Sequence, residues 1–157
     1  MSNTKYNKVL FTDLDGTLIK PIKGTNFPIA CWDVKFIFET LDAIKKYKPD
    51  CVVIISNQGG IKMGYVNEKF FKNKIQWISS CVAEYCDCDC FYKYCPDFDI
   101  YNQNRKPNAG MIFEFMKEND NDSCSYQMIG DRIEDKLCAE NAFIGFQYVD
   151  DFIKEIE

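Results

Sequence analysis

The chain has 157 residues, of which 46% are hydrophobic and 15% aromatic, so we expect residues 1–157 to form one domain with its own core. A net charge of −5 argues against non-specific binding of nucleic acids, and the absence of histidine excludes His-dependent hydrolysis and His-bound zinc. No leader segment and no stretch near the ~20 apolar residues of a membrane span occur, which favours a cytoplasmic location, or a nuclear one in a eukaryote.

A buried strand is predicted at Val9-Leu10-Phe11, and it runs directly into Asp13-Leu14-Asp15-Gly16-Thr17. Two carboxylates at the carboxyl end of a strand lie where open α/β folds bind ligands. Buried carboxylates need a partner, so a cation is expected beside them. The alternative is a turn capped by two Asx side chains. A calcium loop fits this pattern poorly, because Gly16 stands at its fourth position and not at its sixth.

Residues 19–30 contain two prolines and a glycine and are predicted to form an excursion or flap. Asp33 is predicted to cap a helix that continues to Tyr47, with Val34, Ile37 and Phe38 on its buried face. The apolar run 51–55 indicates a strand buried on both faces. That strand ends in the polar turn Ser56-Asn57-Gln58-Gly59-Gly60.

Strand and helix patterns continue to alternate to the end of the chain, which predicts a three-layer Rossmann-like α/β fold around a parallel sheet. The remaining predicted elements are a helix over 67–85, a strand over 89–94, a helix after Arg105-Lys106-Pro107, a loop over 118–122, a strand over 126–129, a helix over 133–141, a strand over 143–149 and a helix over 150–157.

Polar groups therefore follow several strands at one edge of the sheet, where they can converge. Each group is weak evidence alone, because Ser56 could cap a helix and Lys106 could be a solvated charge. Their joint order resembles the four motifs of the haloacid dehalogenase (HAD) superfamily of phosphatases: DxDGT at Asp13 to Thr17, a serine at Ser56, a lysine at Lys106, and GDxxxD from Gly130 to Asp135.

The resemblance implies a role for each of these residues in Mg²⁺-dependent hydrolysis of phosphomonoesters. Asp13 is implied as the nucleophile that forms an aspartyl-phosphate, and Asp15 as the general acid and base. Phosphate binding is implied for the Ser56 hydroxyl, the Asn57 and Gly16 amides, and Lys106. The implied metal ligands are Asp13, Asp131 and Asp135, with a backbone carbonyl of Leu14 or Asp15.

A response-regulator receiver domain, or another non-catalytic binding module, is the alternative from a different class. Receiver domains also combine a phosphorylated Asp, a Ser or Thr and a Lys on a parallel sheet. Their acceptor ends a middle strand, however, whereas Asp13 ends the first strand here and Asp15 supplies an acid/base group.

The gaps between motifs hold no separate cap domain, and two capless subfamilies are similar to the chain. The first comprises histidinol-phosphate and heptose-bisphosphate phosphatases, which share Ser56-Asn57-Gln58 and Arg105-Lys106-Pro107. Many of them bind structural zinc through a cysteine- and histidine-containing loop. At those positions this chain has Asp97, Asn102 and Asn104, so we expect no zinc.

The second subfamily comprises the phosphatase domains of polynucleotide kinase-3′-phosphatases, which the opening 13–19 and the tail 135–141 resemble. No kinase P-loop is present. This resemblance makes removal of 3′-phosphates from nucleic-acid ends the leading expectation, with a small-molecule phosphatase as the alternative. Substrate contacts are expected from Arg105, Lys20 and Lys23, with stacking on Phe27 or Trp32.

Nine cysteines without a secretory leader suggest reduced thiols packed as small hydrophobic groups. Cys86, Cys88 and Cys90 are spaced as CxCxC, and we expect them to alternate between faces and so to hold no zinc. A monomer is favoured.

Overall fold

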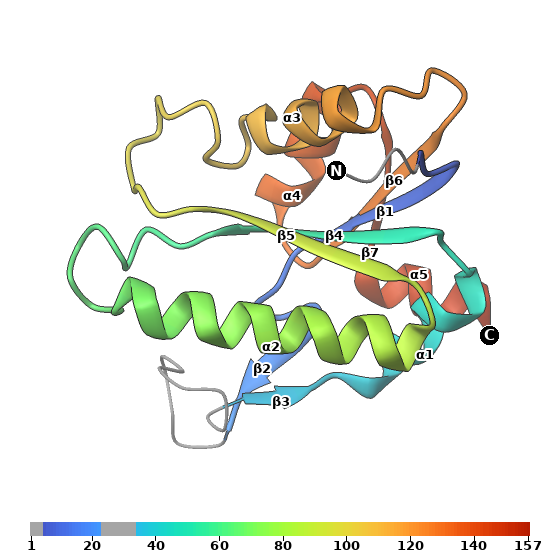
Figure 1. Ribbon diagram of the computed structural model, residues 1–157, viewed down its shortest axis with the longest axis horizontal. Helices are drawn as coiled ribbons and strands as arrows, with labels where there is room; N and C mark the ends of the chain where they lie inside the picture. Colours follow the sequence, from blue (N-terminus) through green and yellow to red (C-terminus); the bar gives the residue numbers. More distant parts are fainter. Residues whose placement is uncertain (1–4, 23–33) are drawn as a thin grey trace.

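The computed structural model describes residues 5–22 and 34–157, and Figure 1 shows a central sheet with helices on both faces. The element bounds are β1 Lys8–Thr12, β2 Ile19–Pro21, β3 Val34–Phe36, α1 Phe38–Tyr47, β4 Cys51–Asn57, α2 Glu68–Cys86, β5 Asp89–Cys95, α3 Gly110–Asn119, β6 Ser125–Gly130, α4 Ile133–Asn141, β7 Gly145–Tyr148 and α5 Val149–Ile156.

Five parallel strands form the central sheet in the order β5-β4-β1-β6-β7. The strand that carries the first motif, β1, therefore lies in the middle, between the strands that carry the second and fourth motifs. This arrangement confirms the predicted α/β fold with a parallel sheet. Parallel order places the carboxyl ends of β1, β4 and β6 side by side, as the predicted convergence requires.

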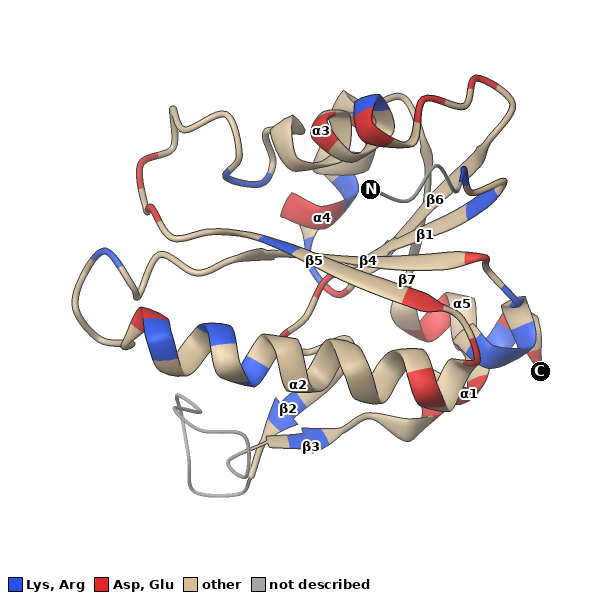
Figure 2. Cartoon of the chain, viewed as in Figure 1, with Lys and Arg blue, Asp and Glu red and all other residues tan. Residues whose placement is uncertain are grey.

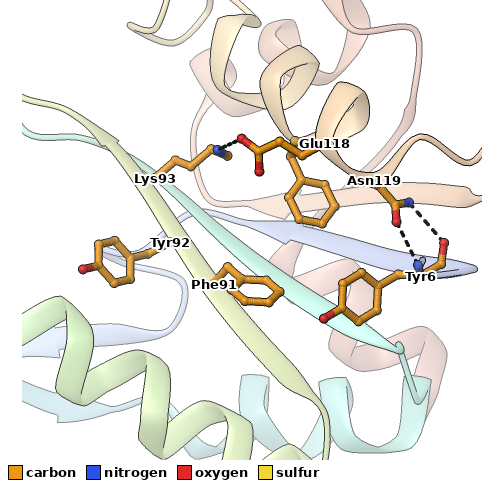
Figure 3. A pocket seen from close by; sticks show the side chains of 7 residues that line it. Tyr6, Phe91, Tyr92, Lys93, Glu118 and Asn119 are labelled. Atoms are coloured by element: carbon orange, nitrogen blue, oxygen red, sulfur yellow. Dashed lines mark hydrogen bonds and ion pairs between the residues drawn. The ribbon is translucent and has the colours of Figure 1, made fainter. Parts of the chain in front are cut away.

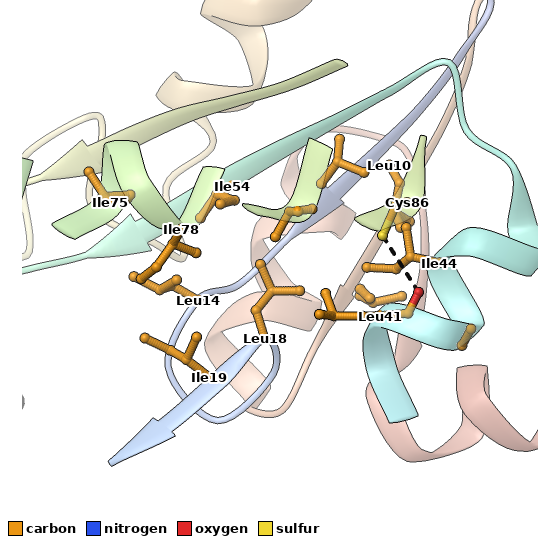
Figure 4. Close-up of a cluster of buried hydrophobic side chains, with 14 of the residues drawn as sticks. Leu10, Leu14, Leu18, Ile19, Leu41, Ile44, Ile54, Ile75, Ile78 and Cys86 are labelled. Carbon is orange, nitrogen blue, oxygen red and sulfur yellow. Dashed lines mark hydrogen bonds between the residues drawn. The ribbon is translucent and has the colours of Figure 1, made fainter. Parts of the chain in front are cut away.

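Two apolar layers hold the sheet between the helices. Leu10 and Ile54 face α1, α2 and α5, in the layer that Figure 4 shows, while Phe11 and Val53 face α3 and α4. This alternation follows from the period of two along a strand. Because β1 and β4 are covered on both faces, their apolar runs are continuous, as predicted.

The predicted helix over 33–47 is wrong at its beginning. Val34–Phe36 is a strand that pairs antiparallel with β2, and helix α1 begins at Phe38. The Ile37 N–H donates to the Leu18 carbonyl, which fixes this segment against the first turn. Phe38, predicted to be buried, is 53% exposed. Pairing between β2 and β3 has overridden the helical spacing of the apolar residues.

The other predicted helices and strands are confirmed, with ends that move by one or two residues. The main difference is in 118–122, where α3 continues to Asn119 before the loop begins. Asn67 caps α2 as expected, since its side chain accepts from the Phe70 N–H. None of the described helices is long and apolar enough to cross a membrane.

The expectation that the CxCxC cysteines alternate between faces is wrong. Cys86 is buried in the core layer beside α2, and Cys88 and Cys90 pack against the same layer. Of the three, only Cys90 lies on a strand, because Cys86 is the last residue of α2 and Cys88 lies in the turn before β5, so strand alternation does not apply to them. Burial raises the pKa of the Cys88 thiol to about 11 and that of Cys90 to about 12, so both are neutral at pH 7.

A separate pocket lies between the edge strand β5 and α3 (Figure 3). Tyr6, Phe91 and Phe115 form its aromatic wall. Lys93 closes one side through ion pairs with Glu114 and Glu118 at 2.8 and 3.1 Å. This pocket shares no residue with the four motifs.

Candidate active site

Lys106 links the residue after β1, strand β4 and helix α4 at the centre of the site. Its Nζ donates to Asp13 Oδ1 and to Asp135 Oδ1, each at 2.7 Å, and to the Ile55 carbonyl at 3.0 Å. The lysine is only 4% exposed. The structure therefore brings together the predicted nucleophile, the predicted lysine and the last aspartate of the fourth motif.

The beginning of α4 fixes Asp135 and, with it, the fourth motif. Asp135 Oδ2 accepts from the N–H groups of Asp131 and Arg132, both at 3.2 Å, so the carboxylate caps the helix. Gly130 is required beside it, because a Cβ on Gly130 would lie 2.4 Å from Asp135 Oδ2. One carboxylate thus holds both the helix and Lys106.

Asp13, Asp131 and Asp135 form an acidic cluster whose oxygen atoms lie within 4.8 Å of one another. Burial alone would lower the pKa of Lys106, but the charges of Asp13 and Asp135 outweigh it and raise that pKa. Desolvation and the neighbouring carboxylates raise the pKa of Asp131 to about 7. Desolvation also raises the pKa of Asp135, against the opposing effect of Lys106.

The acidic cluster fits a hard divalent cation. Three carboxylates face one ammonium group, which leaves an excess of two negative charges when all are ionised. Oxygen ligands of this kind suit Mg²⁺. Among residues 5–22 and 34–157 this is the sole group of three acidic or thiol side chains close enough together to hold a metal.

In the turn after Asp13, the Leu14 carbonyl, a predicted metal ligand, takes part in hydrogen bonds of the backbone. The Leu14 carbonyl accepts N–H bonds from Thr17, Leu18 and Ile19, so it is occupied within the turn and is not a metal ligand in this conformation. The predicted carbonyl ligand that remains is that of Asp15.

Gly16 makes room for the acidic cluster. Its N–H donates to the Ile19 carbonyl at 2.8 Å, which corrects the expectation that this amide binds phosphate. Its φ is +84°, and a Cβ there would lie 2.2 Å from Asp131 Oδ2. Gly16 therefore supplies a left-handed turn and the space for Asp131.

Asp15 lies at the open side of the site, where Gln58 Nε2 donates to its Oδ2 at 3.0 Å. Desolvation and the charge of Asp13 raise the pKa of Asp15, and the bond from Gln58 opposes this shift. The same Gln58 nitrogen donates to the buried Ser56 hydroxyl at 2.7 Å. The sequence marked Gln58 as part of a motif and assigned it no contact.

Asn57 uses its side chain to hold Lys106. Its Nδ2 donates to the Lys106 carbonyl at 3.0 Å, and its Oδ1 accepts from the Lys106 N–H at 2.8 Å. The side chain is thereby committed to the lysine backbone. Binding of phosphate by the Asn57 backbone amide stays a prediction.

Of the residues predicted to contact the substrate, the structure describes Arg105 and Lys20. Arg105 lies beside the Ser56-to-Gly60 turn, since a Cβ on Gly59 would be 3.3 Å from its Nη1, and Nη1 donates to the Asp97 carbonyl at 3.1 Å. Lys20 is exposed on β2, opposite Lys35 on β3. Lys23, with Phe27 and Trp32, lies outside the described residues.

Lys74 is a charged residue near the site that the sequence placed only within a helix. It lies in α2, is 4% exposed, and its charge lowers the pKa of Asp15. Figure 2 shows lysines along the first half of α2 and on β2 and β3.

The loop that contains Asp97, Asn102 and Asn104 carries zinc ligands in many related phosphatases. In this protein side-chain hydrogen bonds close it. Asp97 Oδ1 accepts from the Asp99 N–H at 3.1 Å, and Asn102 Oδ1 accepts from the Asn104 N–H at 2.9 Å. Asn108 Nδ2 donates to the carbonyls of Ile100 and Asn102. These bonds hold the backbone of the loop, and the absence of zinc stays a prediction.

Residues 8–148 match the family model of the polynucleotide kinase 3 phosphatases. Over 139 residues the chain is 33% identical to a D-glycero-beta-D-manno-heptose-1,7-bisphosphate 7-phosphatase of Haemophilus influenzae, covering 82% of this chain and 73% of that protein. It is 34% identical over 146 residues to the protein of that name in Haemophilus ducreyi, covering 86% and 78%.

A solved structure confirms the fold. The protein superimposes with a TM-score of 0.71 on a D,D-heptose 1,7-bisphosphate phosphatase of B. bronchiseptica in complex with magnesium and phosphate, at 22% identity over 90% of this chain and 78% of that one. Together with the four motifs at one sheet edge, the matching family model and relatives establish what the chain is. It is a HAD-family phosphatase and belongs to the polynucleotide kinase 3 phosphatase family.

Proposed function

We propose that this protein is a Mg²⁺-dependent phosphatase of small phosphorylated molecules, of the heptose-bisphosphate type, that acts through an aspartyl-phosphate on Asp13. The observation that carries the proposal is the position of Lys106 Nζ, 2.7 Å from both Asp13 and Asp135. We further propose that residues 1–157 act as one HAD-like domain without a cap.

The acidic cluster, Asp13 with Asp131 and Asp135, would hold the magnesium ion, together with the Asp15 carbonyl. When bound, Mg²⁺ supplies positive charge that screens the nucleophile from the phosphate dianion. The HAD-family phosphatases as a group use Mg²⁺, which supports this assignment.

In the first step an Asp13 oxygen attacks phosphorus, and the bond from phosphorus to the leaving oxygen breaks. Lys106 holds Asp13 Oδ1, so the carboxylate is oriented before substrate arrives. The Ser56 hydroxyl donates to a phosphoryl oxygen. Lys106 contributes its positive charge but no hydrogen bond to phosphate, because Asp13, Asp135 and the Ile55 carbonyl accept its three hydrogens. Asp15, at the open side of the site, gives its proton to the leaving oxygen.

In the second step water displaces Asp13 from phosphorus. Asp15 has become a carboxylate and accepts a proton from that water as the oxygen attacks. The bond between phosphorus and Asp13 then breaks, which releases inorganic phosphate and restores both aspartates. Each group thereby returns to its starting state.

The relatives favour a small-molecule substrate over a nucleic-acid end. Both Haemophilus proteins are named as heptose-bisphosphate phosphatases, which supports the alternative from the sequence and not its leading expectation. The lysines on α2, β2 and β3 suit a substrate with a second anionic group. The description of the matching family model keeps a 3′-phosphorylated nucleic acid as the second candidate.

The test compares phosphate release from a heptose-1,7-bisphosphate, histidinol phosphate and a 3′-phosphorylated oligonucleotide at equal, low concentration with Mg²⁺. We expect the bisphosphate to have the highest kcat/KM, and Asp13→Asn to abolish release from every substrate. A higher kcat/KM for the oligonucleotide, with a steep decrease in salt, would instead favour the second candidate.

A further inference from the structure

Gln58 contacts both the predicted general acid and a predicted phosphate ligand. Its Nε2 lies 3.0 Å from Asp15 Oδ2 and 2.7 Å from Ser56 Oγ. The Gln58 backbone is fixed as well, since its N–H donates to the Cys95 carbonyl and its carbonyl accepts from Ile61. The side chain therefore starts from an anchored position.

The hydrogen-bonding capacity of these groups determines the direction of each bond. Asp15 Oδ2 accepts from the carboxamide nitrogen, which carries two hydrogens, and this leaves Asp15 Oδ1 to carry the proton that the general acid donates. One hydrogen goes to Asp15 and the other to Ser56. Because Ser56 Oγ accepts from Gln58, its own hydrogen remains free to donate to a phosphoryl oxygen.

We propose that Gln58 is a positioning residue of the reaction, which holds the Asp15 carboxyl group toward the leaving oxygen and orients the Ser56 hydroxyl as a donor to phosphate. The inference rests on the proposed phosphatase chemistry and extends it to a residue outside the acidic cluster. Gln58 itself neither attacks phosphorus nor transfers a proton.

The two contacts have different kinetic consequences, which makes them separable. Loss of the Ser56 contact weakens phosphate binding for every substrate alike. Loss of the Asp15 contact matters only where the leaving oxygen needs a proton, as with an alkyl phosphate. A 4-nitrophenolate is weakly basic and leaves without one, and kcat/KM reports this first step.

The test variant is Gln58→Met, which keeps the length of the side chain and removes both donors. We expect kcat/KM to decrease about 10- to 100-fold for an alkyl phosphate and less than about fivefold for 4-nitrophenyl phosphate. Circular dichroism and thermal unfolding check that the variant is folded.

A double-mutant cycle then tests whether Gln58 acts through Asp15. In Asp15→Asn protein, addition of Gln58→Met should no longer decrease kcat/KM more for the alkyl phosphate than for 4-nitrophenyl phosphate. In Ser56→Ala protein, the decrease common to both substrates should disappear while the difference between them persists.

Equal losses for both substrates that persist in Asp15→Asn protein would overturn the inference, as would a Gln58→Met protein with wild-type kinetics. In both cases the wild type is an active phosphatase, so the proposed function stands. An inactive wild type would refute the proposed function and the inference with it.

Discussion

Replacement of Lys106 by Met tests how the site balances its charges. Methionine is similar in length and unbranched, so it fills the same space without the ammonium group. Lys106 is 4% exposed, and the side chains of its partners Asp13 and Asp135 are 10% and 2% exposed. Loss of one partner of a buried ion pair destabilises a protein by about 3–5 kcal/mol, because the remaining charge is left uncompensated. The lost bond to Ile55 adds about 1 kcal/mol.

We therefore expect Lys106→Met to lower the free energy of unfolding by at least about 3 kcal/mol, measured by urea denaturation without added metal. Lys93→Met is the matched control. Lys93 also contacts two carboxylates, at 2.8 and 3.1 Å, but these are 55% and 56% exposed (Figure 3). Solvent screens such pairs, so the control should lose less than about 1 kcal/mol. Equal losses in the two variants would refute the reasoning.

Four further results are expected. Gly16→Ala should abolish most phosphatase activity by displacing Asp131. The control Gly64→Ala also has a positive φ, +82°, but a Cβ there meets nothing within 4 Å, so it should only lower the melting temperature. Equal kinetics in the two variants would contradict the role of Gly16 in making space for Asp131. Asn57→Leu removes two hydrogen bonds to the Lys106 backbone, so kcat should decrease at least about tenfold and the free energy of unfolding in urea by about 2 kcal/mol. A fully active variant would show that these bonds are not needed to position Lys106. Burial raises the pKa of the Cys138 thiol to about 12, so above about pH 9 the unfolded chain loses this proton while the native protein keeps it. The free energy of unfolding should therefore decrease between pH 9 and 12, by up to about 1.4 kcal/mol per pH unit from this thiol. Urea unfolding at several pH values should show a smaller decrease with pH for Cys138→Ala. Elemental analysis should find no stoichiometric zinc, and a zinc chelator should leave the melting temperature unchanged; one zinc per chain would contradict this.

Local patterns in the sequence were sufficient for the sheet and its motif residues. The apolar runs of β1 and β4 reflect burial on both faces, and the alternation with helices fixes parallel order. The same reasoning failed at Val34, because its apolar spacing also fits a helix and pairing with β2 decides the outcome. Such pairing depends on residues distant in the chain, which no local period contains.

In the candidate site, too, the sequence predicts the motif residues but not the contacts between residues distant in the chain. The sequence identified Asp13, Lys106 and Asp135, because the family motifs name them, but it could not show that a single ammonium bridges both carboxylates. Gln58 lies 43 residues from Asp15, so their contact was invisible in the sequence. The Gly16 amide was misassigned because its hydrogen bond forms only once the turn has closed.

The most direct test of the account is to identify the residue that becomes phosphorylated during turnover. The wild-type protein would be mixed with Mg²⁺ and substrate, quenched in acid within milliseconds, digested with pepsin and analysed by mass spectrometry. We expect one phosphoryl group on the peptide that contains Asp13, and none in Asp13→Asn protein. Full turnover with Asp13 unmodified, or a phosphoryl group on Ser56 instead, would contradict it.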